Sequence, residues 1–212
     1  DTLGSYGVGM IRAIRENVTL VEIDLSYCGL SSGAGVNLFT ALQDNFTIRR
    51  LNVRGNCFDG DCHNPLEILL KDTTCLAEVN IGDNKFGASF GLAIADAIAC
   101  NRTMTVLIAD RTNIGIAGAS ALAAFSEAII MNHKIRYLNI DGNRMGPEWG
   151  VQLALAMFKN STITKLSLRD NRLDSRAGDA LCKMFQHNTT LVDLAVSSEE
   201  VGRLVYEELK VF

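Results

Sequence analysis

The stretch ITKLSLRDNRL, residues 163–173, has apolar residues at its first, fourth, sixth and last positions and Asn171 at its ninth. Seven copies of this apolar spacing occur in the chain, and six of them end in a small polar residue followed by an apolar one. Consecutive copies start 28 residues apart, apart from one step of 31 residues. A fixed period of this size is typical of a solenoid, in which each repeat stacks on its neighbours. The copies begin at Leu20, Ile48, Leu76, Met104, Ile135, Ile163 and Leu191.

A second pattern follows each copy of the first. After a turn, apolar residues recur four positions apart, as at Ile94 and Ile98, which is the spacing of one helix face. Each repeat is therefore expected to contain one strand and one helix. The pattern predicts an α/β fold, namely a right-handed solenoid (horseshoe) with parallel strands on the concave face and helices on the convex face.

The 28-residue period with a helix in every repeat resembles the ribonuclease-inhibitor-like subclass of leucine-rich repeats, and the resemblance covers the whole chain. The subclass includes the leucine-rich repeats of the Ran GTPase-activating protein, of NOD-like receptors and of tropomodulin. The resemblance implies a non-catalytic protein-interaction module or scaffold in the cytoplasm, with a protein partner. A GTPase activator of the Ran-regulator type and an actin filament cap like tropomodulin are the alternatives.

The repeat phase predicts how one domain, residues 1–212, is divided. Because the chain opens inside a repeat helix, we expect that earlier repeats belong to a longer protein, or else that the first segment is a cap. Near the other end, Ser197–Glu200 has the sequence of a capping box for a closing helix. The expected parts are an N-terminal partial repeat or cap helix at 1–19, six repeats of about 28 residues at 20–190, and a C-terminal capping strand and helix at 191–212.

Asparagines and glycines recur at fixed places in the repeat. An Asn precedes six of the seven starts by three residues, and we expect it to end each helix in the left-handed conformation. Five of these Asn residues also begin Asn-x-Thr sequons, for which glycosylation is the alternative explanation. The glycines near the helix starts are expected where neighbouring helices leave no room for a side chain. They are Gly35, Gly91, Gly118, Gly150 and Gly178.

The composition argues against two kinds of partner. The net charge is −4 and the pI is about 5.4, whereas nucleic acids and anionic membranes attract basic surfaces. No apolar run approaches the roughly 20 residues of a membrane-spanning helix. We therefore expect a soluble chain with neither partner. The six cysteines are too sparse for a disulfide scaffold, which favours a reducing compartment.

Motifs for catalysis are missing from the sequence, which has no phosphate-binding Gly-x-x-x-x-Gly-Lys, no Gly-x-Gly-x-x-Gly after a strand and no His-Glu-x-x-His. Cys57, Cys62, His63 and Cys75 make a metal site conceivable, but their spacing fits no standard zinc motif. Pro65 favours a helix start displaced by a few residues instead. We expect no catalytic residue, metal, cofactor or small-molecule substrate.

Candidate binding residues come from the outward positions of the predicted strands. Val106, Ile108 and Tyr137 would form an apolar patch in the middle repeats, where interface hot spots tend to lie. Basic residues on either side would form a rim for an acidic partner segment. Scattered surface residues with no joint role are the alternative. The candidates are Arg50, Arg54, Val106, Ile108, Tyr137, Lys165 and Arg169.

Overall fold

The seven strand patterns form seven parallel strands, each paired only with its neighbours in sequence. The computed structural model describes residues 4–202 and 206–207 of the chain. Strand pairs join residues one repeat apart, and this register holds across the 31-residue step, where Val106 pairs with Tyr137. The strands are β1 (Glu22–Asp24), β2 (Arg50–Asn52), β3 (Glu78–Asn80), β4 (Val106–Ile108), β5 (Tyr137–Asn139), β6 (Lys165–Ser167) and β7 (Asp193–Ala195).

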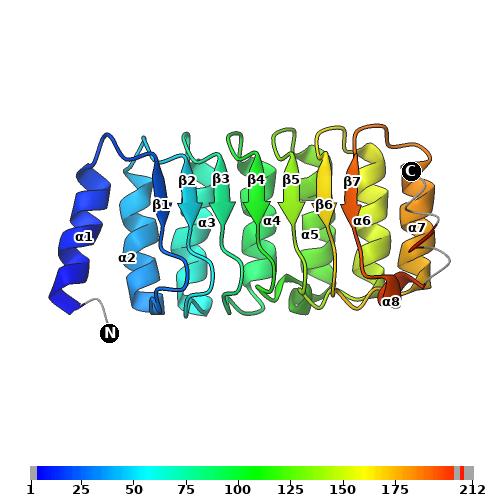
Figure 1. The fold of residues 1–212 in the computed structure, drawn as a ribbon, viewed down its shortest axis with the longest axis horizontal. Helices are drawn as coiled ribbons and strands as arrows, with labels where there is room; N and C mark the ends of the chain where they lie inside the picture. Colours follow the sequence, from blue (N-terminus) through cyan, green and yellow to red (C-terminus); the bar gives the residue numbers. More distant parts are fainter. Residues whose placement is uncertain (1–3, 203–205, 208–212) are drawn as a thin grey trace.

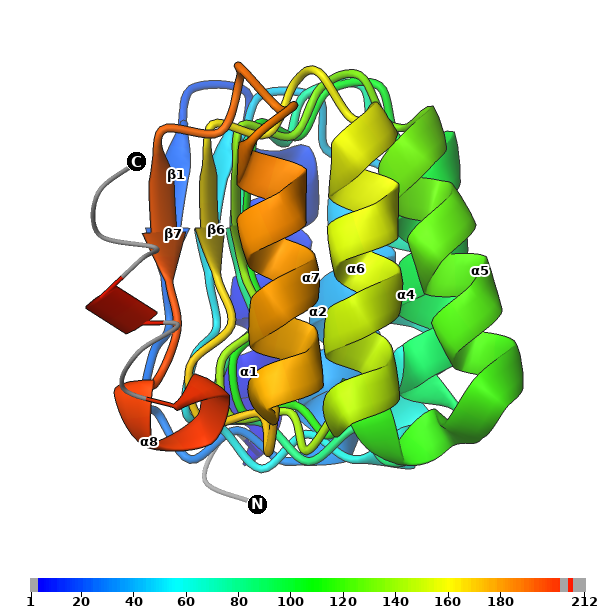
Figure 2. The same ribbon diagram turned by 90° about the vertical axis from the view of Figure 1, so that its right-hand side faces the viewer.

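Helices connect consecutive strands and lie on one side of the sheet. Figure 1 shows the strands as a row in front of the helices, and Figure 2 shows the two layers from the end, with the helices on the convex side. This confirms the predicted solenoid. The helices are α1 (Gly4–Glu16), α2 (Ser32–Gln43), α3 (His63–Asp72), α4 (Phe90–Cys100), α5 (Gly118–Met131), α6 (Pro147–Lys159), α7 (Ser175–Phe185) and α8 (Ser198–Val201), with 3₁₀ turns η1 (Gly60–Cys62) and η2 (Ile114–Ala117).

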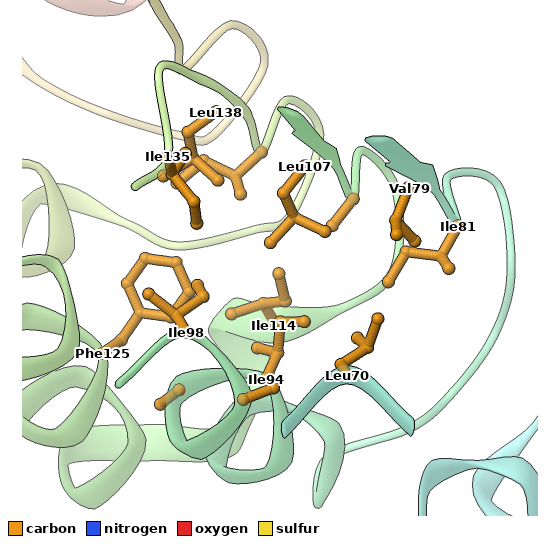
Figure 3. Packing of buried hydrophobic residues seen from close by; sticks show 14 of the residues in the cluster. Leu70, Val79, Ile81, Ile94, Ile98, Leu107, Ile114, Phe125, Ile135 and Leu138 are labelled. Atoms are coloured by element: carbon orange, nitrogen blue, oxygen red, sulfur yellow. The ribbon is translucent and has the colours of Figure 1, made fainter. Parts of the chain in front are cut away.

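The core fills the space between the two layers. In Figure 3, Leu107 and Leu138 point from the sheet side toward Ile98 and Phe125 of the helices, and all four side chains are buried. The same positions are apolar in each repeat, so the core is continuous along the solenoid. A single repeat buries only part of this surface by itself, which makes the array stable only as a stack.

Buried asparagines follow the strands in four repeats, at positions 56, 84, 143 and 171. The Nδ2 of Asn143 donates hydrogen bonds to the carbonyl oxygens of Ala109, 2.8 Å away in the preceding repeat, and of Ile140, 3.0 Å away in its own. Thr112 takes the Asn place one repeat earlier, and its backbone N–H and hydroxyl both donate to Oδ1 of Asn143. Each amide thus bridges two turns that are buried from water.

A second column of asparagines precedes the strands. The Nδ2 of Asn101 donates to the carbonyl oxygen of Leu70, in the helix of the preceding repeat, at 2.6 Å. Its Oδ1 accepts the backbone N–H groups of Thr103 and Met104. The φ of Asn101 is −64°, so the predicted left-handed conformation is wrong and the side-chain amide is the reason for Asn here. The buried members of this column are Asn45, Asn101, Asn132, Asn160 and Asn188.

The burial of these asparagines also bears on whether their Asn-x-Thr sequons are glycosylation sites. The side chains of the sequon residues Asn45, Asn101, Asn160 and Asn188 are buried, and their Nδ2 atoms donate to backbone carbonyls. An attached sugar would have to replace these hydrogen bonds and leave the carbonyls unpaired. Repeat packing therefore explains these four sequons.

The predicted lack of room at helix starts is confirmed at three glycines. A Cβ added to Gly35, Gly91 or Gly150 would lie 2.5–2.7 Å from a side-chain atom of the next repeat. The explanation is wrong for Gly118, where a Cβ would meet nothing within 4 Å. Gly118 instead has a φ of +80°, a backbone conformation that L side chains rarely adopt.

The three extra residues of the long repeat lie in its helix. Helix α5 has 14 residues and α4 has 11, while the strands on both sides keep their register. The stretch Ile114–Met131 is nevertheless long and apolar enough to cross a membrane by length and composition, contrary to our expectation. In this fold it belongs to the convex layer, because β4 and β5 on either side of it pair in one sheet.

The predicted capping box at Ser197–Glu200 is wrong. The Ser197 hydroxyl donates to Asp170, and a Glu200 carboxylate oxygen accepts the backbone N–H of Arg172. Both residues thus bond to the preceding repeat instead of capping α8, whose N-cap has no side-chain hydrogen bond. Part of the predicted closing helix lies outside the described residues.

Replacing Asn143 with Ala should destabilise the whole array. The change removes the donor for two buried carbonyls and the acceptor for two buried N–H groups, each costing about 1–3 kcal/mol when left unpaired. We expect a loss of at least about 3 kcal/mol in the free energy of unfolding, measured by urea denaturation. Asn17→Ala is the control, because its partners are exposed and water can replace the amide. Equal losses in the two variants would contradict the proposed role of the buried amides.

Candidate functional site

The register of the sheet arranges the outward side chains in rows across the strands. One row contains Glu22, Arg50, Glu78, Val106, Tyr137, Lys165 and Asp193. A second row contains Asp24, Asn52, Asn80, Ile108, Asn139, Ser167 and Ala195. The predicted outward positions therefore lie side by side on one concave face.

The three apolar candidates occupy the middle of this face. Val106 pairs directly with Tyr137, and Ile108 is the outward residue two positions after Val106 on β4. All three side chains are partly buried. Two shallow hollows flank them: the N-terminal hollow, over β1 to β4, has Val106 and Ile108 in its wall, and the C-terminal hollow, over β5 to β7, has Tyr137.

Two of the four basic candidates pair with carboxylates on a neighbouring strand. Arg50 donates from Nε and Nη2 to one oxygen of Glu22, at 2.9 and 2.7 Å. Lys165 lies 3.3 Å from a carboxylate oxygen of Asp193. These side chains are about half exposed, so the pairs add little to stability, but they leave less positive charge for a partner than predicted.

Arg54 is held more firmly than any other basic candidate. Its Nη1 donates to Oδ1 of Asp110 at 2.6 Å, its Nη2 contacts both Asp110 and Asp83, and its Nε donates to the Tyr27 hydroxyl at 2.9 Å. The hydrogen bond to Asp110 raises the pKa of Arg54 further above its ordinary value. Arg111 also pairs with Asp83, at 2.7 Å. We call these five residues the Arg54 network; it joins the turns after β1, β2, β3 and β4.

Gly82 makes the Arg54 network possible. Asp110 lies two repeats from Arg54 in sequence, so the guanidinium must cross the outward position between them, which Gly82 occupies. A Cβ on Gly82 would lie 2.4 Å from Oδ1 of Asp110 and 2.7 Å from Nη1 of Arg54. The missing side chain thus leaves the path along which Arg54 reaches Asp110. The donors of Arg54 thus bind carboxylates and a hydroxyl of this chain, whereas the sequence alone suggested a rim for an acidic partner.

Arg169 has a different environment at the C-terminal hollow. Its backbone N–H donates to Oδ1 of Asp141 at 2.6 Å, and the Ser167 hydroxyl contacts both oxygens of the same carboxylate. Burial raises the pKa of Asp141. Among the described residues, Arg169 is the basic candidate whose side chain makes no ion pair within 4.0 Å.

The irregular segment between Cys57 and Cys75 does not assemble a metal site. Cys62 is buried with its Sγ 3.1 Å from the carbonyl oxygen of Ser32, and Cys75 is buried with its Sγ 3.4 Å from that of Asn45. A ring nitrogen of His63 contacts the carbonyl oxygen of Gly60. In the part of the chain that the structure describes, no three such groups are placed to hold a metal ion. The predicted displacement of the helix start is confirmed, because η1 replaces the first turn of α3.

Sequence reasoning missed the Arg54 network. Tyr27, Asp83 and Arg111 all lie in turns after strands, at the same repeat position, and all have φ between 53° and 54°. That position lies just after the outward positions of the strand pattern. Two signals were available in the sequence. Tyr27, Asp83 and Arg111 are spaced by whole repeats, 56 and 28 residues apart, and Gly82 stands at an outward position that is polar in the other repeats.

Comparisons with known proteins agree with this geometry. A family model described as "Leucine Rich repeat" matches residues 159–182. The human "NACHT, LRR and PYD domains-containing protein 5" is 24% identical over 169 residues, which are 79% of this chain and 14% of that protein. This chain thus corresponds to a small part of that relative.

Two solved structures share the fold. The C-terminal domain of tropomodulin from Caenorhabditis elegans superposes with a TM-score of 0.61 at 17% identity, covering 73% of this chain and 92% of that chain. The leucine-rich repeat protein LegL7 from Legionella pneumophila has a TM-score of 0.62 at 20% identity, covering 98% and 65%.

Gly82→Ala should weaken the Arg54 network. The added Cβ would overlap Asp110 and Arg54, so we expect a loss of about 1–3 kcal/mol in the free energy of unfolding, measured in urea. Gly33→Ala is the matched control, since its Cβ would find nothing closer than 4.0 Å and it lies in α2. The control should be neutral or slightly stabilising, by at most about 1 kcal/mol. A neutral Gly82→Ala would show that the crossing does not need glycine.

Thiol reactivity should separate the buried Cys62 from the exposed cysteines. Burial raises the pKa of Cys62, and the thiolate is the reactive form, so alkylation of the native chain should be slow there. Cys28 and Cys57 are exposed and should react first with iodoacetamide, as followed by mass spectrometry. In urea the three rates should become similar. Rapid native labelling of Cys62 would contradict its position in the core.

Proposed function

Because the chain is a leucine-rich repeat protein of the ribonuclease-inhibitor-like type, we propose that it is a non-catalytic module whose concave strand face binds a protein partner. A row of parallel strands presents a broad surface with many outward side chains at fixed spacing. Such a surface suits another protein, which can contact several repeats at once.

The observation that carries this proposal is the apolar group formed by Val106, Ile108 and Tyr137. It lies at the centre of a face whose other outward residues are mostly polar, and a hollow flanks it on each side. Protein interfaces commonly have an apolar or aromatic centre within a polar rim, and most of the binding energy comes from a few central residues. We infer that these three residues anchor the partner and that Lys165 and Arg169 lie at its margin.

The ion pairs of the basic candidates support this assignment of anchor and margin residues. Carboxylates of the chain already bind Arg50 and Arg54, which leaves Arg169 as the basic candidate that is most available to a partner. Arg54 then has a supporting role, because its network fixes the turns at the edge of the N-terminal hollow.

Affinity capture with the intact chain tests the proposal. Proteins retained from an extract of the source cells are identified by mass spectrometry for the wild type, for Tyr137→Ala with Val106→Asp, and for Leu155→Ser. Leu155 is the control, since it is an exposed apolar residue of α6 on the convex side. We expect a protein that binds the wild type and Leu155→Ser but is lost from the concave variant, with Tyr137→Ala alone costing about 2 kcal/mol of affinity.

Circular dichroism of each variant shows whether it is folded. If the concave variant is folded and retains every protein that the wild type binds, the concave face is not the site. Loss of binding in Leu155→Ser alone would assign the site to the convex side.

A further inference from the structure

The N-terminal hollow has an excess of negative charge next to its apolar wall. Its charged side chains are the carboxylates of Glu22, Asp24 and Glu78 and the single guanidinium of Arg50. At about 200 Å³, it is smaller than typical small-molecule sites, which span roughly 300–1,000 Å³. Its size therefore favours one side chain of a partner over a separate ligand.

The internal bonds show which of these charges remain available. Arg50 donates both of its hydrogen bonds to Glu22. Asp24 accepts from the Ser26 hydroxyl at 2.6 Å and from Asn52 at 2.9 Å, and these bonds lower the pKa of Asp24, so it is ionised at neutral pH. Glu78 is exposed and, among the described residues, makes no ion pair within 4.0 Å.

The position of Glu78 would also favour a basic partner side chain over an acidic one. In the register of the sheet it pairs with Arg50 on one side and with Val106 on the other. A carboxylate therefore lies directly beside the apolar centre of the face. Lysine and arginine carry an apolar stem with a charged end, which matches this arrangement of apolar and acidic groups.

We propose that the N-terminal hollow binds a lysine or arginine side chain of the partner, with its stem on Val106 and Ile108 and its cationic end at Glu78. The inference rests on the proposed function, because it names the chemistry of the partner at the same face. It replaces the predicted preference for acidic segments at Arg50 and Arg54. An incoming carboxylate would meet Glu22, Asp24 and Glu78, and the guanidinium of Arg50 is already paired.

Selection of peptides on the intact chain tests this inference. A phage-displayed library of random peptides is panned against the wild type, and affinities of the enriched peptides are measured by fluorescence anisotropy. We expect peptides with Lys or Arg beside apolar residues. Glu78→Gln should weaken them about fivefold, and Glu78→Lys by about tenfold or more. Glu127→Lys is the control, because it makes the same charge change at an exposed position of α5.

The outcomes separate this inference from the proposed function. Enriched acidic peptides whose binding is lost in Val106→Asp would overturn the inference and leave the concave site intact. Basic peptides that bind Glu78→Lys as well as the wild type would also overturn it. Peptides unaffected by any concave variant would count against the proposed function itself. If no peptide is enriched, the hollow does not bind a side chain as proposed, whatever the affinity capture shows.

Discussion

The fold depends on side-chain amides that satisfy buried backbone groups at the strand ends, with four buried asparagines after strands and five before them. Short strands joined by tight turns leave carbonyl and N–H groups without a ladder partner, and each would cost about 1–3 kcal/mol unpaired. Asn143 after β5 and Asn101 before β4 meet this need by bonding to the preceding repeat as well as their own. These bonds tie neighbouring repeats together at the same spacing as the strands. The three extra residues of the long repeat are accordingly in α5, where they disturb neither column of amides nor the strand register.

Strict register has a direct consequence for the concave face. Residues one repeat apart lie next to each other, so opposite charges at equivalent positions pair, as Glu22 does with Arg50 and Lys165 with Asp193. In the same row of outward residues, charged Glu78 lies next to apolar Val106, and no ion pair forms between these two positions. The face therefore has an acidic hollow, an apolar centre and a weakly basic hollow, in that order along the solenoid. A partner that contacts all three regions would have to match this order.

The Arg54 network shows how a glycine lets a side chain form an ion pair with a residue two repeats away. Arg54 reaches Asp110 across two repeats because Gly82 has no side chain, and Tyr27 and Arg111 complete the contacts on either side. From its position in the repeat alone, Arg54 has a long basic side chain on the concave face, which suggests a contact with a partner. Its actual bonds depend on its rotamer and on acidic residues in turns that the strand pattern does not cover. The sequence therefore located Arg54 correctly but did not reveal its bonds to Asp83 and Asp110 within the chain.

The sequence by itself determined the number of strand patterns, the strand positions and the rows of outward residues, because a fixed apolar period allows one stacking register. The tertiary structure decided what those outward residues do. It showed that the asparagines before the strands act through side-chain hydrogen bonds and not through a left-handed backbone. It also showed that Ser197 and Glu200 bond to the preceding repeat. Finally, it placed the carboxylate of Glu78, which makes no ion pair with any described residue, beside Val106. The physical reason is that buried apolar residues recur at a fixed spacing along the sequence and can be read from it. Hydrogen bonds and ion pairs depend instead on how side chains of neighbouring repeats are oriented toward one another.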